Sequence, residues 1–293
     1  MRYLLRVRAP RVLALLPLAL GFACARSSSV SVEPGAAQPD ATPSGAHVAR
    51  TPASGHDVLV AMHERYGRSW SGALRYLQSN TLFRTDGGEA RSEWVRQFDA
   101  PGRQRIDYLP LSSRSGVLYE GGRAHVFIEG KRVRSEARLD PRQLLIADIG
   151  ARSADSTARL LTSLGFALDA LHTATWDGRP VLIVGAAAGD TTRAQFWVDA
   201  ERFLLLRLVY PETGGTRTIV TDTRFSRWTE HDGAPVAEEI LQVRDGTPVW
   251  REEALRIEVG PTFPAAAFDP ERWGEGRPVE FVARSHDEAS SRK

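Results

Sequence analysis

Apolar and polar residues alternate along most of the chain with the period of two that is typical of β-strands. The alternation begins near residue 73 and resumes after short clusters such as Asp86-Gly87-Gly88 and Asp177-Gly178. These clusters favour tight turns, because glycine and aspartate tolerate the backbone angles that a hairpin requires. The pattern predicts about ten or eleven antiparallel strands, which are too many for one flat sheet, so the sheet should curl towards a barrel.

The first departure from the strand pattern is a helical stretch at the start of the domain. Val58, Leu59, Met62 and Tyr66 fall on one face of a helix, and Gly67 is suited to end it. We therefore expect a short N-terminal helix ahead of the strands.

The second departure lies between two blocks of strands. Asp140-Pro141 is suited to begin one helix and Ser153 to begin another, in which Leu160, Leu161 and Leu164 form an apolar stripe. A helical insertion in the middle of a curled sheet predicts a lid. The predicted fold is a β-rich α+β class: an incomplete, half-closed antiparallel β-barrel with a helical lid and an N-terminal helix.

The N-terminal region has the composition of an export signal and a tether. Arginines precede an apolar run in residues 12–25 that is shorter than the about 20 residues of a membrane-spanning helix, which is typical of a signal peptide. Residues 26–54 are rich in Ser, Pro, Ala and Gly without periodic apolar positions, which predicts a disordered linker. We expect a signal peptide at 1–25, the linker at 26–54, one domain at 55–273 and a polar tail at 274–293.

Cys24 is the only cysteine, and it stands where the apolar run meets the linker. Its position resembles the lipobox of bacterial lipoproteins, in which the cysteine carries a diacylglyceryl group, although Gly21 and Phe22 depart from that pattern. The alternative is ordinary cleavage after Ala23-Cys24-Ala25, which would remove the cysteine. Lipidation of Cys24 would attach the protein to a membrane of the cell envelope.

The charge of the exported chain gives no reason to expect a nucleic-acid partner. The leader carries four of the 38 basic residues, so 34 remain against 36 acidic residues and the net charge is about −2. With one cysteine the chain cannot form an intrachain disulfide or a cysteine-based metal site.

Arrangements that would support catalysis are missing from the sequence. His63-Glu64 is followed by Gly67 where a zinc-protease helix has its second histidine, and no G-x-S-x-G motif occurs. Glu252-Glu253 is a pair of neighbours on a predicted strand, whose side chains face opposite sides. Solvation accounts for Asp140 and Asp148. We expect no catalytic residue, no metal site and no cofactor.

The order of elements, together with one segment, resembles the LolA-like outer-membrane lipoprotein-sorting proteins. The segment reads WDGRPVLIVGA from Trp176 to Ala186, and it is followed by Gly189-Asp190, by QFWVD at 195–199 and by Glu201-Arg202. The resemblance covers residues 55–273. It implies a half-closed barrel that holds an acyl chain under a helical lid, in a protein that acts in the periplasm. The ligand-contacting residues of that family form no short motif that could be transferred.

The mouth of a curled sheet is a usual place for an apolar ligand, so we expect a lipid or a lipoprotein acyl chain as the partner. The alternative is a membrane-tethered sensor or assembly scaffold of the same fold that binds an envelope protein or a peptide. The candidate lipid-binding residues are aromatic residues on two strands and leucines of the lid: Trp94, Phe98, Leu160, Leu161, Leu164, Phe196 and Trp197.

The first prediction concerns Cys24. Protein extracted from membranes should carry the added mass of a diacylglyceryl group on an N-terminal Cys24, because a lipobox cysteine is modified before cleavage. Intact-mass measurement tests this directly, and an unmodified protein that begins at Arg26 would contradict it.

Overall fold

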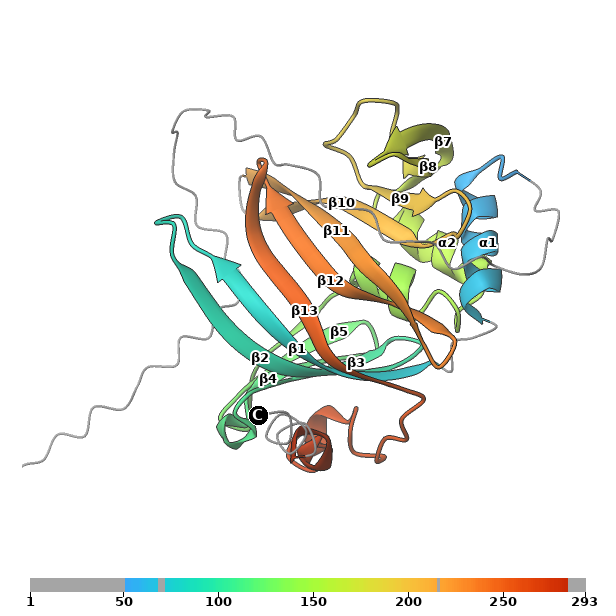
Figure 1. The fold of residues 1–293 in the computed structure, drawn as a ribbon. Helices are drawn as coiled ribbons and strands as arrows, with labels where there is room; N and C mark the ends of the chain where they lie inside the picture. Colours follow the sequence, from blue (N-terminus) through green and yellow to red (C-terminus); the bar gives the residue numbers. More distant parts are fainter. Residues whose placement is uncertain (1–50, 68–71, 215–216, 284–293) are drawn as a thin grey trace, which may run out of the picture. The chain divides into compact units, whose positions relative to one another are not determined.

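The computed structural model describes residues 51–67, 72–214 and 217–283. Within them, thirteen strands form one antiparallel sheet in the order β6-β5-β4-β3-β2-β1-β13-β12-β11-β10-β9-β8-β7. Two meanders, β1 to β6 and β7 to β13, thus meet where β1 pairs with β13 (Figure 1). Among the described residues β6 and β7 remain at opposite edges, so the sheet is open, and the predicted incomplete, half-closed antiparallel barrel is confirmed without closure.

The first meander contains the following strands: β1 (Ala73–Phe83), β2 (Glu89–Asp99), β3 (Arg103–Tyr108), β4 (Gly116–Glu120), β5 (Arg123–Ile128) and β6 (Lys131–Ala137). The second contains β7 (Ala167–Trp176), β8 (Arg179–Gly185), β9 (Gln195–Asp199), β10 (Leu205–Gly214), β11 (Arg217–His231), β12 (Ala234–Arg244) and β13 (Thr247–Val259). The sequence predicts ten or eleven strands, two or three fewer than these thirteen. One strand without a clear alternation is β6, whose one large apolar side chain, Val133, is 56% exposed.

The helical elements are α1 (Gly55–Gly67), η1 (Leu111–Ser113), η2 (Gln143–Ala147), α2 (Ala154–Ser163) and η3 (Pro270–Arg272). The predicted N-terminal helix is confirmed as α1, and all four residues of its apolar stripe are buried. Ser54 accepts a hydrogen bond from the backbone N–H of Asp57 while the carboxylate of Asp57 accepts one from the N–H of Ser54, which caps the helix. The last residues of the predicted linker therefore take part in the fold.

The predicted helical insertion is also confirmed, with one short element and one longer helix. η2 has the wide π-helical winding, and α2 is capped at its start by Ser153, whose hydroxyl accepts a hydrogen bond from the backbone N–H of Ser156. The chain from β6 to β7 runs through these two elements from one edge of the sheet to the other. The predicted signal peptide, Cys24 and the predicted linker up to residue 50 lie outside the described residues, as does the predicted tail from residue 284.

The main core lies between the helices and the second meander. α1, η2, α2 and strands β8 to β11 contribute most of the buried apolar side chains of one cluster, and connecting residues such as Ile149, Phe166 and Leu204 contribute the rest. Figure 1 shows α1 and α2 beside the second meander. Leu182 and Val184 of β8 face this cluster, whereas their neighbours Val181 and Ile183 pack on the other face of the sheet. The helices thus fill the space in front of this half of the sheet.

The C-terminal segment covers the other face of the first meander (Figure 1). Trp273 stacks on Phe127 with ring centroids 4.3 Å apart, and its ring lies against Gly116, where a Cβ atom would collide with it. Packing continues beyond Trp273, since Phe281 is fully buried. Residues at the start of the predicted polar tail therefore belong to the core.

Arg105 of β3 fixes this segment in place. Its fully buried guanidinium forms two hydrogen bonds to the carboxylate of Asp107, at 2.7 and 2.9 Å, and donates to the carbonyl oxygens of Ala267 and Trp273. It also lies 3.9 Å from the centroid of the Trp273 ring. One side chain thus satisfies a buried carboxylate and two backbone carbonyls.

The second prediction tests this arrangement. Arg105→Met should lower the free energy of unfolding in urea by about 3–5 kcal/mol, because it leaves the Asp107 carboxylate buried without a partner. Arg103→Met on the same strand is the control: Arg103 is 48% exposed and pairs with Asp99, so its loss should cost at most about 1 kcal/mol. Equal losses of unfolding free energy in the two variants would contradict this role of Arg105.

Candidate functional site

The face of the sheet that η2 covers carries the candidate site. Trp94, Arg96 and Phe98 alternate along β2 and therefore share this face. Phe98 packs in a small apolar cluster with Leu74 of β1, Val236 of β12 and Ala147 of η2. The start of the helical insertion thus lies over the place where the two meanders meet.

Two small pockets lie next to each other between η2 and the sheet, each with a volume of about 30 Å³. Tyr76, Phe98, Ile146, Ala147 and Ile240 line both of them. The first pocket is otherwise apolar, with these further lining residues: Leu74, Pro235, Val236 and Ala237. The second adds Phe225 and a set of polar residues: Arg96, Gln104, Asp140, Arg142 and Gln143. An apolar space therefore continues into a polar one.

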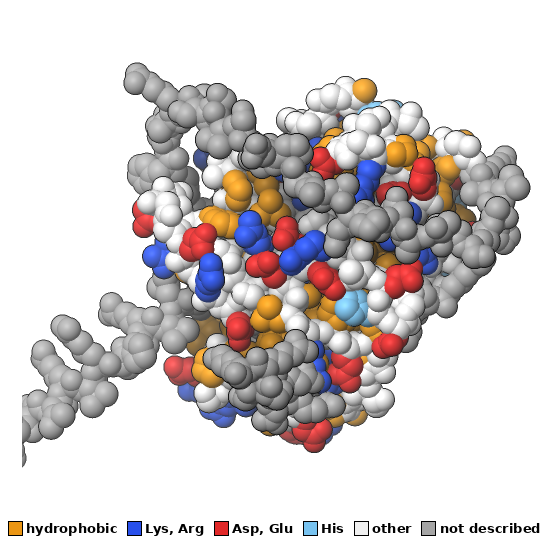
Figure 2. All heavy atoms as spheres, viewed as in Figure 1, with side chains coloured by type: hydrophobic (Ala, Val, Ile, Leu, Met, Phe, Trp, Pro, Cys, Tyr) orange, Lys and Arg blue, Asp and Glu red, His pale blue; other side chains and the backbone are white. Residues whose placement is uncertain are grey.

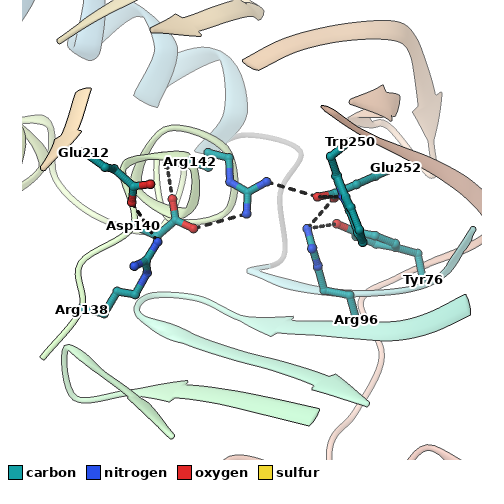
Figure 3. Close-up of polar contacts among 8 residues, drawn as sticks. All are labelled: Tyr76, Arg96, Arg138, Asp140, Arg142, Glu212, Trp250 and Glu252. Atoms are coloured by element: carbon teal, nitrogen blue, oxygen red, sulfur yellow. Dashed lines mark hydrogen bonds and ion pairs between the residues drawn. The ribbon is translucent and has the colours of Figure 1, made fainter. Parts of the chain in front are cut away.

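An ion-pair network borders the polar pocket (Figure 3). Glu252 of β13 accepts hydrogen bonds from Arg96 at 2.9 Å and from Arg142 at 3.2 Å. Arg142, directly before η2, also pairs with Asp140 at 3.5 Å. The network therefore ties the start of η2 to two strands from opposite ends of the described chain.

Two further contacts extend the network (Figure 3). The hydroxyl of Tyr76 accepts a hydrogen bond from Arg96 at 3.3 Å, and the indole N–H of Trp250 donates to Glu252 at 3.2 Å. Beside them, Arg138 pairs with Glu212 of β10 at 3.1 Å, with both side chains nearly half exposed. Three guanidinium groups and three carboxylates thus occupy this region.

Glu252 and Asp140 stay ionised at neutral pH, because the pKa of each is lowered. Burial is the largest effect on the pKa of Glu252 and raises it, but the guanidinium groups of Arg96 and Arg142 together outweigh burial and hold the pKa below its ordinary value. The same balance lowers the pKa of Asp140, where Arg142 acts against burial. Both groups therefore favour the folded state above their ordinary pKa values and lose that contribution as the pH falls.

The far end of η2 is held by a different carboxylate. Asp148 accepts a hydrogen bond from the backbone N–H of Gly102, in the turn between β2 and β3, and pairs with Arg152 at 3.2 Å. Burial raises the pKa of Asp148 above its ordinary value in spite of these partners. The pH dependence of its contribution to stability is opposite to that of Glu252. The contribution of Asp148 is greatest at low pH and declines as the pH rises through its raised pKa.

An aromatic group lies along the same face. The ring of Trp94 is 5.0 Å from that of Tyr108 on β3 and 5.2 Å from that of Trp250 on β13, measured between centroids. All three side chains are partly buried. Trp94 and Trp250 lie on the strands that carry Arg96 and Glu252, so the three rings form an apolar surface at that end of the face.

The candidate lipid-binding residues fall into three places. Phe98 lines both pockets, and Trp94 belongs to the aromatic group beside them. Leu161 is fully buried in the main core, with Leu160 and Leu164 packed against that core. Phe196 is buried in the same core, whereas Trp197, the next residue, packs on the opposite face against Trp176. Only Phe98 of this set lines either pocket, and lipid contact stays a prediction for each.

The sequence does not predict this network, and the expectation that Asp140 and Asp148 are solvated is wrong. The side chain of Asp140 is 12% exposed and that of Asp148 is 1% exposed, because η2 presses both against the sheet. One signal was available for Arg96: it lies between Trp94 and Phe98 at alternate positions, so an inward-facing aromatic row must include an arginine. Such an arginine requires a buried acid, and Glu252 supplies it.

Metal binding and a basic surface receive no support from the described residues. They contain no group of three or more His, Cys, Asp and Glu side chains placed to hold a metal ion. Figure 2 shows acidic and basic side chains intermixed across the middle of the face in view. This mixture agrees with the near-neutral charge expected from the sequence, in which neither sign prevails.

Comparison with known proteins gives a match of structure and none of sequence. No protein-family model matches the chain, and no curated protein matches it. A solved structure of a DUF1329 family protein from Desulfovibrio piger is similar with a TM-score of 0.50 and 15% identity over 73% of this chain and 95% of that chain. The similarity shows the fold. A LolA superfamily protein from Nitrosomonas europaea is also found, with a TM-score of 0.49 and 15% identity over 72% of this chain and 96% of that one.

The third prediction concerns the pH dependence of the network. At pH 7 the wild-type protein should exceed Glu252→Gln in free energy of unfolding by up to about 3–5 kcal/mol, because the variant leaves Arg96 buried without its acid. Below about pH 4.5, the ordinary pKa of this carboxyl, the difference should shrink as Glu252 becomes protonated and neutral like glutamine. Urea unfolding of both proteins between pH 7 and pH 3 measures it. A difference that stays constant over this range would show that the ion pairs contribute nothing specific.

Proposed function

We propose that this protein is a non-enzymatic cell-envelope protein that binds acyl chains of lipids or lipoproteins between η2 and the sheet. The observation that supports this proposal is the apolar pocket lined by Leu74, Phe98, Val236 and Ile240, with Ile146 of η2 above it. Apolar lining beside a few convergent polar groups is typical of small-molecule sites. Of the expected helical insertion, η2 lines this pocket, whereas the predicted lid residues Leu160, Leu161 and Leu164 lie in or against the main core. The proposal therefore assigns the role of a lid to η2.

Binding requires the lid to move. Each pocket has a volume of about 30 Å³, which is roughly the volume of one water molecule in the liquid. Ligand pockets usually have volumes of about 300–1,000 Å³. On this proposal the pockets are in a closed state, and an acyl chain enters by displacing part of η2.

The contacts of η2 favour a small displacement over a large one. Ile146 and Ala147 face the pockets, while Leu144 and Leu145 are buried in the main core. An acyl chain that replaces the contacts of Ile146 and Ala147 would leave Leu144 and Leu145 in place. Polar contacts at Arg142 and Asp148 hold the two ends of η2, so a displacement that keeps these buried contacts costs less than one that breaks them.

Export to the envelope is part of the proposal. It is supported by the N-terminal leader and by the position of Cys24 before a segment of linker composition. Among the described residues, no helix combines the length and the apolar character that crossing a bilayer would require. A lipid on Cys24, with the linker as a tether, would place the domain near a membrane from which it could take acyl chains.

The small size of the pockets favours a second candidate function, a tethered sensor or scaffold that binds a protein or peptide. Such a protein needs no internal cavity, and the core beneath α1 and α2 is already filled with side chains. The two functions differ in one observation. An acyl-chain carrier purified from its native envelope should bring lipid with it in a defined ratio, which mass spectrometry of an organic extract detects, whereas a scaffold should not.

The fourth prediction tests the pocket. Ala237→Phe should fill the apolar pocket and lower the affinity for a fluorescent diacylglycerol by tenfold or more, which corresponds to about 1.4 kcal/mol. Overpacking of this kind costs about 1–3 kcal/mol of stability, so the variant should remain folded by circular dichroism.

The matched control is Ala174→Phe. Ala174 packs with Val181 and Ile183 on the opposite face of the sheet, so the same enlargement there should leave the affinity unchanged. Unchanged binding by Ala237→Phe, or a wild-type protein that binds no diacylglycerol, would remove the carrier function in favour of the scaffold.

A further inference from the structure

The winding of η2 changes along its length. At its start the backbone N–H of Leu144 donates to the carbonyl oxygen of Asp140, four residues back, at 3.2 Å. At its end the N–H of Asp148 donates to Gln143, five residues back, at 2.9 Å. Such single turns of π-helix are rare and often mark functional sites. If the last turn tightened to the α-helical winding, Asp148 would donate to Leu144 instead, so its N–H would keep a partner while the preceding side chains turned about the helix axis.

The part of the insertion that faces the sheet at this end is short. Leu145 and Ile149 are fully buried in the main core, and the carbonyl oxygen of Ile149 accepts a hydrogen bond of 2.9 Å from Nδ1 of His63 in α1. Between these two anchored residues, Ala147 packs on the sheet in the small apolar cluster. Residues 146–148 are therefore the segment that can separate from the sheet while the main core stays packed.

The two ends of η2 are held to the sheet with unequal strength. Arg142 forms a charged hydrogen bond to Glu252 of β13, whose side chain is 5% exposed (Figure 3). Asp148 accepts one hydrogen bond from the sheet, from the N–H of Gly102, because its partner Arg152 belongs to the insertion and moves with it. Burial raises the pKa of Asp148, so its ionised carboxylate is less favourable here than in water. When a displacement of η2 grows until one end must be released, the Asp148 end is therefore released first.

The two pockets differ in the end of η2 that they reach. Arg142 and Gln143 line the polar pocket, whereas Ile146 and Ala147 are the only residues of η2 that line the apolar pocket. An opening at the Asp148 end would therefore expose the apolar pocket, while Arg142 stayed over the polar one.

We infer that the lid opens at its Asp148 end, where residues 146–148 leave the sheet and the last turn of η2 tightens from the π-helical to the α-helical winding. Arg142 stays in place as the hinge, and the hydrogen bond between Gly102 and Asp148 is the contact that keeps the lid closed. An acyl chain thus enters through the apolar pocket. The inference rests on the proposed function for what enters, whereas the opening itself takes place without a ligand.

The first test measures hydrogen exchange of single amides by NMR in the full-length protein without ligand. After correction for intrinsic rates, the amides of Asp148 and Gly102 should exchange alike and about tenfold or more faster than that of Leu144, because the same opening exposes both while the hinge end stays closed. Protection of Asp148 or Gly102 equal to or greater than that of Leu144 overturns the inference, whatever the protein binds.

The second test removes the contact. In Asp148→Ala the amide of residue 148, which is bonded to Gln143, should exchange about tenfold or more faster than in the wild type, because the end of η2 is no longer held to Gly102. The amide of Leu144 should be unaffected. Unchanged exchange at residue 148, or the same acceleration at Leu144, would refute the hinge.

Two further variants control this test. Asp148→Asn keeps an oxygen that Gly102 can donate to, so it should restore most of the wild-type protection. Asp155→Ala removes an acid of α2 that is 74% exposed and pairs with His56, so it should leave exchange at residues 144 and 148 unchanged. If Asp148→Ala does not fold, the comparison of amides in the wild-type protein decides.

The third test separates the inference from the proposed function. Exchange is measured again with a fluorescent diacylglycerol at saturation, and the amide of Gly102 should exchange about tenfold or more faster while Leu144 keeps its protection. If the diacylglycerol binds and Gly102 keeps its protection, or Leu144 loses its own, the inference fails and acyl-chain binding stands. If it does not bind, the proposed function fails, and the exchange of the free protein still decides where the lid opens.

Discussion

The pairing of β1 with β13 is the contact on which the rest of the structure depends. Each meander can form from neighbouring segments of the chain, but the two become one sheet only when these strands from opposite ends of the domain meet, with Leu74 opposite Val259 and Leu82 opposite Trp250. The seam also places Tyr76 of β1 and Glu252 of β13 on one face, where Arg96 reaches both. The pairing of β1 with β13 thus determines both the position of the site and the continuity of the sheet.

Much of this architecture follows from local features of the sequence. The alternation of apolar residues and the glycine turns predict a curled antiparallel sheet that forms an incomplete barrel, and the stripe from Val58 to Tyr66 predicts α1. β6 escapes the pattern because an edge strand that is exposed on both faces needs no apolar face. The burial of Phe281 could not be predicted either, since a lone aromatic residue in a polar segment has no periodicity.

The ion-pair network could not be predicted because it joins residues that are remote in sequence. Glu252 resembles any acid on an amphipathic strand until the sheet order places it beside Arg96 and the insertion places Arg142 above it. Buried ion pairs add little net stability, since desolvation offsets most of their attraction. Their effect here is on geometry: they give η2 a fixed position over an apolar surface that would otherwise accept many arrangements.

The two edges of the open sheet are protected from pairing with other chains by different means. β6 carries Lys131, Arg132, Arg134 and Glu136 along its short length, and such charges oppose the addition of a strand from a neighbouring molecule. β7 has fewer charges but packs against α1. A chain with thirteen hydrogen-bonded strands and two free ends would otherwise be an aggregation hazard at high local concentration. The charges of β6 and the packing of α1 on β7 therefore oppose edge-to-edge pairing where copies of the protein are crowded.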